Sequence, residues 1–374
     1  MTVATALVAG NDPLPELAAA AVGEALRKSD LSHVNGVLLF LTPDFARHAQ
    51  QAVTAAARAA QCTQVAGGIA AGVFTESGWV LDRPAAAVMV FGRGLSLGHP
   101  NASGEPLLSY AGSAFPSDWS EAGARFGGSF TGTVGYADPV AWQQGRLAAQ
   151  QRCGVQLLGA RVSVGVSSGL RLLGEPQRID CSSGYDLQTL GGRRALDSLT
   201  RALPAELRDR ASLPLHHLTA VLIDDENRET AAAALATGRY RPIAIVAANA
   251  EGSLTLAERL PPGQYLAWAS RQPLPAEADM RQTLARLSAS APRPACALMF
   301  SCIGRGPFFY GGEDRDLDIV RERFPGLPLL GTYGTGQIAP TANGVQHLNR
   351  QLQNAVVTAL VTKHPEPAHV QSIA

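Results

Sequence analysis

Two distant stretches of the chain share one pattern, and this internal repeat constrains the fold more than any single residue does. In the first stretch the apolar run Gly36–Phe40 precedes a helical segment and the block Gly67–Gly72 (GGIAAG). In the second, Ala297–Phe300 precedes a helical segment and the block Gly331–Gly336 (GTYGTG). Another apolar run follows each block. A repeated strand–helix–glycine turn–strand unit predicts two related lobes, and a cleft between lobes is a preferred place for a small ligand.

Composition excludes several classes of protein. The 374 residues are 46% hydrophobic and 17% charged, which is typical of a globular chain long enough for two domains. Basic and acidic residues balance at 31 each, so no overall field attracts nucleic acid or an anionic membrane. The five cysteines form no CxxC pair, no secretory signal is supported, and no apolar run approaches the roughly 20 residues that span a bilayer. We therefore expect a cytoplasmic protein without membrane insertion.

Apolar runs separated by glycine and proline predict an α+β fold, with large mixed or antiparallel sheets flanked by helices. The stretch from 99 to 120 is rich in Pro, Ser, Gly and Asn and is interpreted as a long surface loop. Pro204–Pro214 is polar and flanked by prolines, and is the best domain boundary. Helices are expected at residues 15–29, 43–60, 193–203, 275–290 and 313–324.

The segment 301–313 (SCIGRGPFFYGGE) is the densest candidate for a ligand-binding loop. It leaves an apolar strand, passes four glycines and enters a helix, so backbone N–H groups can approach an anionic ligand. Arg305 could add a bidentate clamp for a carboxylate or phosphate. The alternative is a tight connection whose acidic residues already complement the helix dipole. The candidate residues here are Ser301, Cys302, Gly304, Arg305, Gly306 and Tyr310.

The block GTYGTGQ is the second candidate. Tyr333 could present an aromatic face and a hydroxyl, and Gln337 an amide, at the mouth of a cleft. The alternative is a glycine-bent strand with Tyr333 packed in the core. The candidates are Gly331, Tyr333, Gly334, Gly336 and Gln337, with Gly67, Gly68 and Gly72 from the N-terminal block.

Other chemistries remain open. Cys302 could be a nucleophile activated by Arg305, but it needs a base, and the nearest downstream histidine is His347. The eight histidines form no HxxxH pair, so a metal site made only by the protein is not expected. A haem needs only one axial histidine, with Cys302 as a second possible ligand. The acidic segment 224–226 could hold a cation or form a solvated turn.

These motifs resemble a known family. FSCIGRGPFFYGG, followed by a helix and PLLGTYGTGQIAP, is similar to the C-terminal half of the FIST domain, with its Phe-Ser-Cys-x-x-Arg-Gly signature and Gly-x-x-x-x-Gly-Glu-Ile block. The N-terminal half resembles the family through VAGGIAAGVFTESG and through residues 173–203. The resemblance covers roughly residues 30–362. It implies a FIST N-like domain at 1–210, a FIST C-like domain at 215–363 and a flexible tail at 364–374.

The family is regarded as a sensory module that binds small ligands, with amino acids or their derivatives proposed, and haem-linked gas sensing has been attached to some members. The resemblance implies a separate signalling partner such as a histidine kinase, a cyclase or a chemoreceptor. Gln337 stands where the family often has Glu, which removes a charge that could bind a ligand amine. Leu170 also departs from the pattern. The matched positions are Ser301, Cys302, Arg305, Gly306, Gly331, Tyr333, Gly334 and Gly336.

Overall fold

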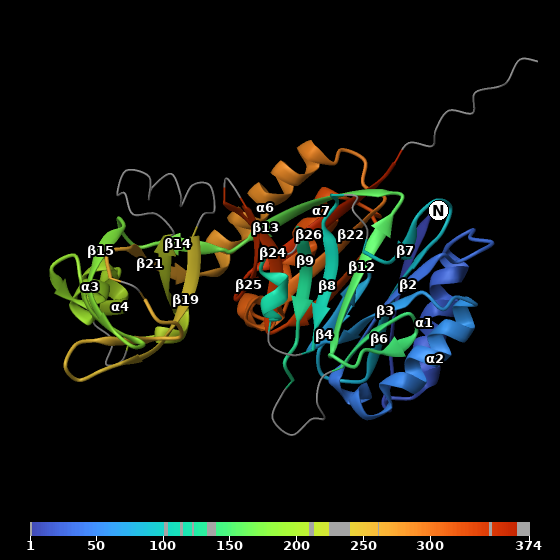
Figure 1. The fold of residues 1–374 in the computed structure, drawn as a ribbon, viewed down its shortest axis with the longest axis horizontal. Coiled ribbons are helices and arrows are strands. Elements are labelled where there is room, and N and C mark those ends of the chain that lie inside the picture. Colours follow the sequence, from blue (N-terminus) through green and yellow to red (C-terminus); the bar gives the residue numbers. More distant parts are fainter. Residues whose placement is uncertain are drawn as a thin grey trace, which may run out of the picture. The chain divides into compact units, whose positions relative to one another are not determined.

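A computed structural model gives the fold of most of the chain (Figure 1). It describes residues 2–100, 104–112, 115–121, 123–132, 140–208, 213–223, 240–260, 262–343 and 346–364. The predicted tail beyond residue 364, the acidic segment 224–226 and part of the predicted domain boundary lie outside the described residues.

The chain forms two compact units that are described separately. Unit 1 comprises Met1–Ser167, Arg281–Pro340 and Leu348–Ala374, and unit 2 comprises Ser168–Met280 and Thr341–His347. These units are defined by contacts in space, whereas the division into FIST N-like and FIST C-like segments is drawn along the sequence. That division stays a prediction.

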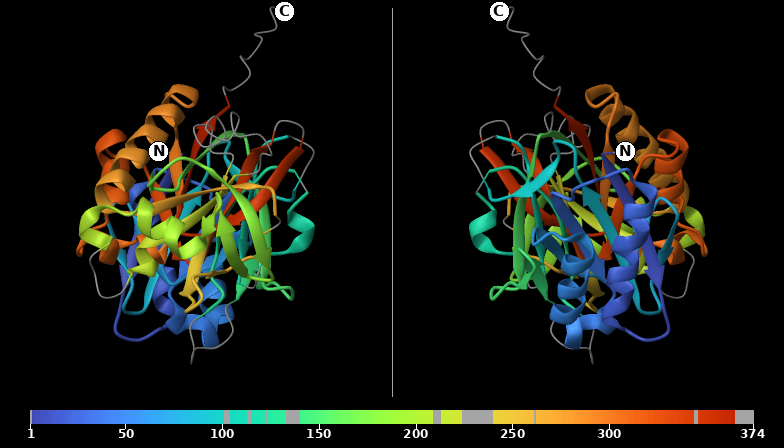
Figure 2. Two further views of the ribbon diagram at one scale, coloured as in Figure 1. Left: turned by 90° about the vertical axis from the view of Figure 1, so that its left-hand side faces the viewer. Right: turned by 90° about the vertical axis from the view of Figure 1, so that its right-hand side faces the viewer.

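The first sheet of unit 1 is covered on one face by α1 (Pro15–Lys28) and α2 (Ala49–Ala60), the blue helices of Figures 1 and 2. In α1 the buried residues Ala18, Ala21, Val22 and Ala25 recur at helical spacing, which gives the helix one apolar face. A 3-10 turn, η1 (Pro43–His48), leads into α2. Both helix predictions are therefore confirmed.

The strands of this first sheet run in the order β1-β6-β2-β3-β10-β11. At its centre β2 pairs in parallel with β3 and antiparallel with β6, and β1 continues the sheet antiparallel to β6. Strand β1 was not predicted from the sequence. The strands are β1 (Val3–Ala9), β2 (Gly36–Leu41), β3 (Val65–Ile69), β6 (Ala85–Phe91), β10 (Ala141–Gln143) and β11 (Arg146–Leu147).

The second sheet, in the order β13-β26-β22-β23-β4-β5, repeats this arrangement. Here β22 pairs in parallel with β23 and antiparallel with β26, and β13 is antiparallel to β26. The predicted duplication is thus confirmed, and both copies lie within unit 1. The strands are β4 (Gly72–Thr75), β5 (Gly78–Val80), β13 (Ala160–Ser167), β22 (Cys296–Cys302), β23 (Leu329–Gly334) and β26 (Val356–Lys363).

A third sheet, in the order β25-β24-β9-β8-β12-β7, shares the core of unit 1 with the other two, while the ends of β24 and β25 that lie within Thr341–His347 belong to unit 2. Strand β8 lies inside the stretch predicted to be a surface loop, so that prediction is wrong for its centre. All five residues of the run LLSYA are buried there, and burial of its apolar side chains favours a strand although the flanking residues are polar. The strands are β7 (Ser96–Gly98), β8 (Leu107–Ala111), β9 (Arg125–Ser129), β12 (Arg152–Leu158), β24 (Gly336–Asn343) and β25 (Gln346–Leu352), with η2 (Ser117–Trp119).

The inner faces of the three sheets meet at an aromatic cluster of Phe40, Tyr110, Phe126 and Phe300. The Phe40 ring lies 5.0 Å from that of Tyr110 and 6.1 Å from that of Phe300, and Phe126 lies 6.4 Å from Phe300. The first sheet contributes Phe40, the second Phe300, and the third Tyr110 and Phe126. The cluster therefore joins the two copies of the repeat in one core.

Unit 2 is built around a ring of antiparallel strands. The order β14-β21-β15-β16-β20-β19-β18 closes on itself because β18 also pairs with β21. Apolar side chains of these strands, together with α3, form a separate core. The elements are β14 (Leu170–Leu172), β15 (Gln177–Ser183), β16 (Asp186–Leu190), β17 (Arg193–Arg194), α3 (Ala195–Ala202), α4 (Ala205–Arg208), η3 (Leu215–His217), β18 (Leu218–Ile223), β19 (Tyr240–Ala248), β20 (Leu254–Leu256) and β21 (Tyr265–Arg271).

The glycine turns of the two repeats meet directly. After β3 the chain leaves the first sheet, and β4 pairs antiparallel with β23, which places Gly72 opposite Tyr333 and Phe74 opposite Gly331. The N–H of Ala71 also donates to the carbonyl of Tyr333 at 2.9 Å. A Cβ atom at Gly331 would lie 2.0 Å from the Phe74 ring. Glycine is therefore required at position 331 for Phe74 to pack there.

We predict that Gly331→Ala lowers the free energy of unfolding by at least about 1–3 kcal/mol, because the added methyl group overpacks the site against Phe74. Urea denaturation measures the loss. The matched control is Gly78→Ala on β5 of the same sheet, where a Cβ meets nothing within 4 Å, and the change should stay below about 1 kcal/mol. Adding Phe74→Leu to Gly331→Ala should recover part of the loss. Equal losses in the two single variants would contradict the steric explanation.

Candidate functional site

The predicted loop connects β22 to α7 (Arg315–Arg323) through two short 3-10 turns, η4 (Ile303–Arg305) and η5 (Pro307–Tyr310). Gly311 and Gly312 have φ angles of +86° and +120°, which L side chains rarely adopt. The predicted strand–glycine loop–helix connection is confirmed. Its surface includes Gly304 and Phe308, whose side chain is 78% exposed, whereas its base is buried.

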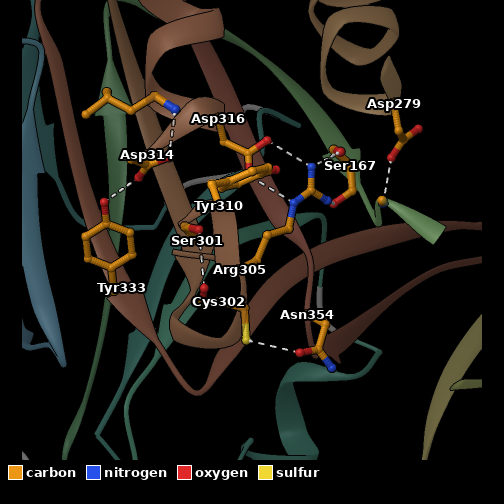
Figure 3. A network of polar contacts seen from close by, with 12 residues as sticks. Ser167, Asp279, Ser301, Cys302, Arg305, Tyr310, Asp314, Asp316, Tyr333 and Asn354 are labelled. Atoms are coloured by element: carbon orange, nitrogen blue, oxygen red, sulfur yellow. Dashed lines mark hydrogen bonds and ion pairs between the residues drawn. The ribbon is translucent and has the colours of Figure 1, made fainter. Parts of the chain in front are cut away.

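Arg305 lies at that base with only 2% of its surface exposed. Its Nε and Nη2 atoms each donate to one oxygen of the Asp316 carboxylate, both at 2.9 Å. Nη1 donates to the carbonyl of Ser167 at 2.9 Å, and Nη2 to the Ser167 hydroxyl at 2.8 Å (Figure 3). The guanidinium thus makes the bidentate contact that the sequence predicts for a ligand, but with a carboxylate of its own chain.

Asp316 is fully buried and also accepts a hydrogen bond from the Tyr310 hydroxyl at 2.9 Å (Figure 3). Burial alone would lower the pKa of Arg305, but the Asp316 carboxylate outweighs it and holds that pKa above its ordinary value. Burial, with the Asp316 charge, raises the pKa of Tyr310. Arg305 therefore stays charged and paired, and the group fixes the base of the loop.

Asp314 is the capping residue just before α7 and connects this helix to β23. Its Oδ1 atom accepts from the N–H of Leu317 at 3.0 Å, which caps the helix. Its Oδ2 atom accepts from the Tyr333 hydroxyl (Figure 3). Burial, reinforced by the nearby Asp316 charge, raises the pKa of Asp314 to about 6. Burial also raises the pKa of Tyr333.

Tyr333 is fully buried, with its ring 4.7 Å from that of Phe74. The block GTYGTG is a strand that bends between β23 and β24, as the alternative interpretation had it. Gly72 packs against the Tyr333 ring, while Gly68 packs against Tyr110. The structure thus brings Gly72 into contact with Tyr333, and places Gly68 beside the aromatic cluster.

Gln337 is fully buried in β24, and neither its amide oxygen nor its amide nitrogen has a hydrogen-bond partner among the described residues. It pairs with Gly128 of β9, so its side chain lies on the same face of the sheet as a Cβ at Gly128 would. That Cβ would lie 2.9 Å from the Phe300 ring and 3.3 Å from the Tyr110 ring. The Gln337 amide therefore faces the aromatic cluster.

Ser301 and Cys302 end β22. The Ser301 hydroxyl donates to the carbonyl of Cys302 at 3.4 Å. The Cys302 side chain is buried, with its Sγ atom 3.9 Å from Oδ1 of Asn354 (Figure 3). The described part of the chain contains no group of three or more His, Cys, Asp or Glu side chains able to hold a metal ion. A haem with one axial ligand needs no such group, so the haem and Cys302 alternatives stay predictions.

Two participants in this network, Ser167 and Asn354, were not predicted from the sequence. Ser167 ends β13 more than a hundred positions before Arg305, and no local pattern connects them. From the sequence, Asp314 and Asp316 were expected only to complement the helix dipole. The capping position of Asp314, ahead of an apolar helical pattern, was a usable signal for its role.

Comparison with known proteins agrees with the C-terminal motif. Residues 195–340 match the model of the FIST C domain. Uncharacterised proteins of Mycobacterium bovis and of Mycobacterium tuberculosis (strain CDC 1551 / Oshkosh) are each 32% identical to this chain over 191 residues. Another, from M. tuberculosis strain ATCC 25618 / H37Rv, is 29% identical. The two 32% matches cover 50% of this chain and 48% of each relative. The 29% match covers 50% of this chain and 49% of the relative. The chain therefore matches only about half the length of each relative.

We expect Arg305→Met to lower the free energy of unfolding by about 3–5 kcal/mol, because it leaves the Asp316 carboxylate buried without its partner. The double variant Arg305→Met/Asp316→Leu should recover much of that loss. Arg281→Met is the control, because Arg281 pairs with Glu322 with both side chains 50% exposed, and should change stability by less than about 1 kcal/mol. Chemical denaturation gives all three values. A double variant no more stable than Arg305→Met would contradict the assignment.

Asp314 makes stability depend on pH. Its pKa is about 6 in the folded chain against an ordinary 3.8, so the folded state binds the proton more tightly. This contribution is fully present below pH 3.8 and is lost as pH rises through 6, by up to about 3 kcal/mol. Asp314→Asn keeps an amide oxygen for the helix cap but removes the titration. The stability difference between wild type and variant should therefore fall from about pH 4 to pH 6 and then level off. A flat difference in urea denaturation across that range contradicts the prediction.

Proposed function

We propose that the chain is a cytoplasmic sensory protein, because residues 195–340 match the model of the FIST C domain, a sensory domain family to which small-ligand binding is attributed. Its ligand is an amino acid or related metabolite, which binds between the two related halves of unit 1. Ligand binding changes the contact of this protein with a signalling partner such as a histidine kinase, a cyclase or a chemoreceptor. None of the described helices combines the length and apolarity that crossing a bilayer requires.

The observation that carries this proposal is the buried amide of Gln337. A polar group without a hydrogen-bond partner in a protein interior costs about 1–3 kcal/mol. An occupant that satisfies both amide atoms removes that cost, so a polar ligand is favoured there. The amide offers two donors and an acceptor, which suit the carboxylate and amino groups of a small metabolite.

The surroundings of Gln337 have the character of a ligand site. Phe300 comes from the C-terminal repeat, and Tyr110 lies on β8, next to the N-terminal repeat through Phe40 and Gly68. Most small-molecule sites combine such apolar and aromatic walls with a few polar groups that fix orientation. A ligand at this point contacts both halves of the duplication at once.

Population shift is the proposed mechanism. Since Gln337 is fully buried, the ligand enters a more open arrangement and stabilises the one that encloses it. The turn at Gly334–Gly336 lies directly before Gln337, and β23 on its other side is tied through Tyr333 to Asp314 and α7. Movement at the turn therefore reaches the surface loop that carries Phe308, which is the proposed contact for the partner.

Arg305 acts here as a positioning residue. Its guanidinium holds the base of the loop to Ser167 and Asp316, so the exposed part of the loop moves with β22 and α7. A buried network of this kind is rigid when every member is satisfied. The exposed part of the loop therefore changes position together with the core.

Thermal-shift screening against amino acids and related metabolites tests the proposal. A ligand at 100 times its dissociation constant should stabilise the wild type by about 2.7 kcal/mol. Gln337→Leu should be at least as stable as the wild type without ligand, because it removes an unsatisfied amide. It should lose the ligand-induced shift.

The control is Ser120→Ala, which removes a hydroxyl that donates to the carbonyl of Ser117 outside the glycine turns, and should keep the shift. Gln337→Glu restores the residue common in the family and should favour ligands with an amino group. A Gln337→Leu variant that responds to the same ligand as strongly as the wild type would exclude Gln337 from the site.

A further inference from the structure

Unit 2 carries a groove of about 630 Å³ that has no part in the site described above. It lies along β17 and the first two turns of α3. Its charged and polar lining is contributed by Arg193, Arg194, Asp197, Thr200 and Arg201. We propose that this groove binds a small molecule with an anionic group at each end and a hydroxyl or ammonium group between them.

Three guanidinium groups are available to an anion in this groove. Arg193, Arg194 and Arg201 are exposed, and none has a hydrogen-bond or ion-pair partner for its side chain within the described ranges of the chain. Arg201 follows Asp197 by one helical turn, a spacing that permits an ion pair, yet the two are not paired. Guanidinium groups bind carboxylates and phosphates in bidentate fashion.

The position of the arginines sets the shape of the ligand. Arg194 precedes the first turn of α3 and Arg201 lies in its last turn. Seven residues of helix separate them by about 10 Å. A molecule with two separated anionic groups can contact both arginines with their side chains extended, whereas a single inorganic anion contacts both only if the side chains turn inward over the groove. The positive end of the helix dipole adds to the attraction at Arg194.

Asp197 determines what lies between the two anionic ends. Its carboxylate lines the groove between Arg194 and Arg201, and Thr200 lies on the same side of the helix, one turn along. A carboxylate repels a third negative charge but accepts a hydrogen bond from a hydroxyl or ammonium group. The groove therefore selects a hydroxylated or aminated dianion over a simple one.

Isothermal titration of the full chain with glucarate, a six-carbon hydroxylated dicarboxylate, and separately with fructose bisphosphate, tests this assignment and distinguishes a dicarboxylate from a bisphosphate. We expect saturable one-to-one binding of at least one of them, weakened by added salt because the contacts are exposed charges. Adipate, which has the same six-carbon chain without hydroxyl groups, should bind more weakly than glucarate. It should gain affinity in Asp197→Asn, which removes the repulsion.

Arg193→Ser/Arg201→Ser should weaken the binding at least tenfold, the value of one charge-assisted hydrogen bond. Arg171→Ser, an exposed arginine of the same unit outside the groove, is the matched control and should bind as the wild type does. Unchanged melting temperatures show that the variants fold. If the double variant does not fold, the single variant Arg194→Ser replaces it in the binding measurement. Failure of both ligands to bind, or equal binding by the arginine variant, overturns the assignment. Neither result depends on Gln337.

Discussion

The direct pairing of β4 with β23 is the constraint on which the rest of unit 1 depends. Two strands from opposite halves of the duplication approach closely enough for Phe74 to lie against the backbone of Gly331. A side chain at position 331 would separate them. The same pairing fixes Tyr333 beside Phe74, and with it the direction in which β24 leaves for the third sheet. The two copies are thus fused through their turns.

The buried pair of Arg305 and Asp316 shows why a binding motif and a structural motif can have the same sequence. Bidentate recognition of a carboxylate needs an arginine held in a fixed geometry, whether the carboxylate belongs to a ligand or to the protein. Here Asp316 enters from the first turn of α7, only 11 positions from Arg305. A buried pair of this kind contributes little net stability, but loss of one member is severe. Its value lies in defining one conformation of the loop.

The sequence predicted the parts of the fold that local patterns determine. Apolar runs marked β2, β6, β22 and β26, and their order with the glycine blocks revealed the duplication. The pairings that join distant segments were not predictable in this way. Nothing near Ser167 indicates its contact with Arg305, and nothing near Leu218–Ile223 indicates that this strand closes a ring with β21. The surroundings of Gln337 depend on Gly128, which is separated from it by most of the chain.

The strand β8 shows a different limit. Its flanks are rich in residues typical of loops, and their composition led to the prediction of a loop. The five residues at the centre are nevertheless a buried strand. Tyr110 packs against Phe40 and against Gly68, both of which come from the first sheet. A short strand whose partners are all distant leaves only a weak periodic signal of its own.

The closed ring of unit 2 limits how a partner protein can recognise it. Proteins often associate by adding a strand to the open edge of a sheet, where unpaired backbone groups are available. In the ring, β18 and β21 use those groups on each other. Recognition along β18 and β21 has to rely on side chains and loops, and therefore varies with sequence more readily than a backbone contact does.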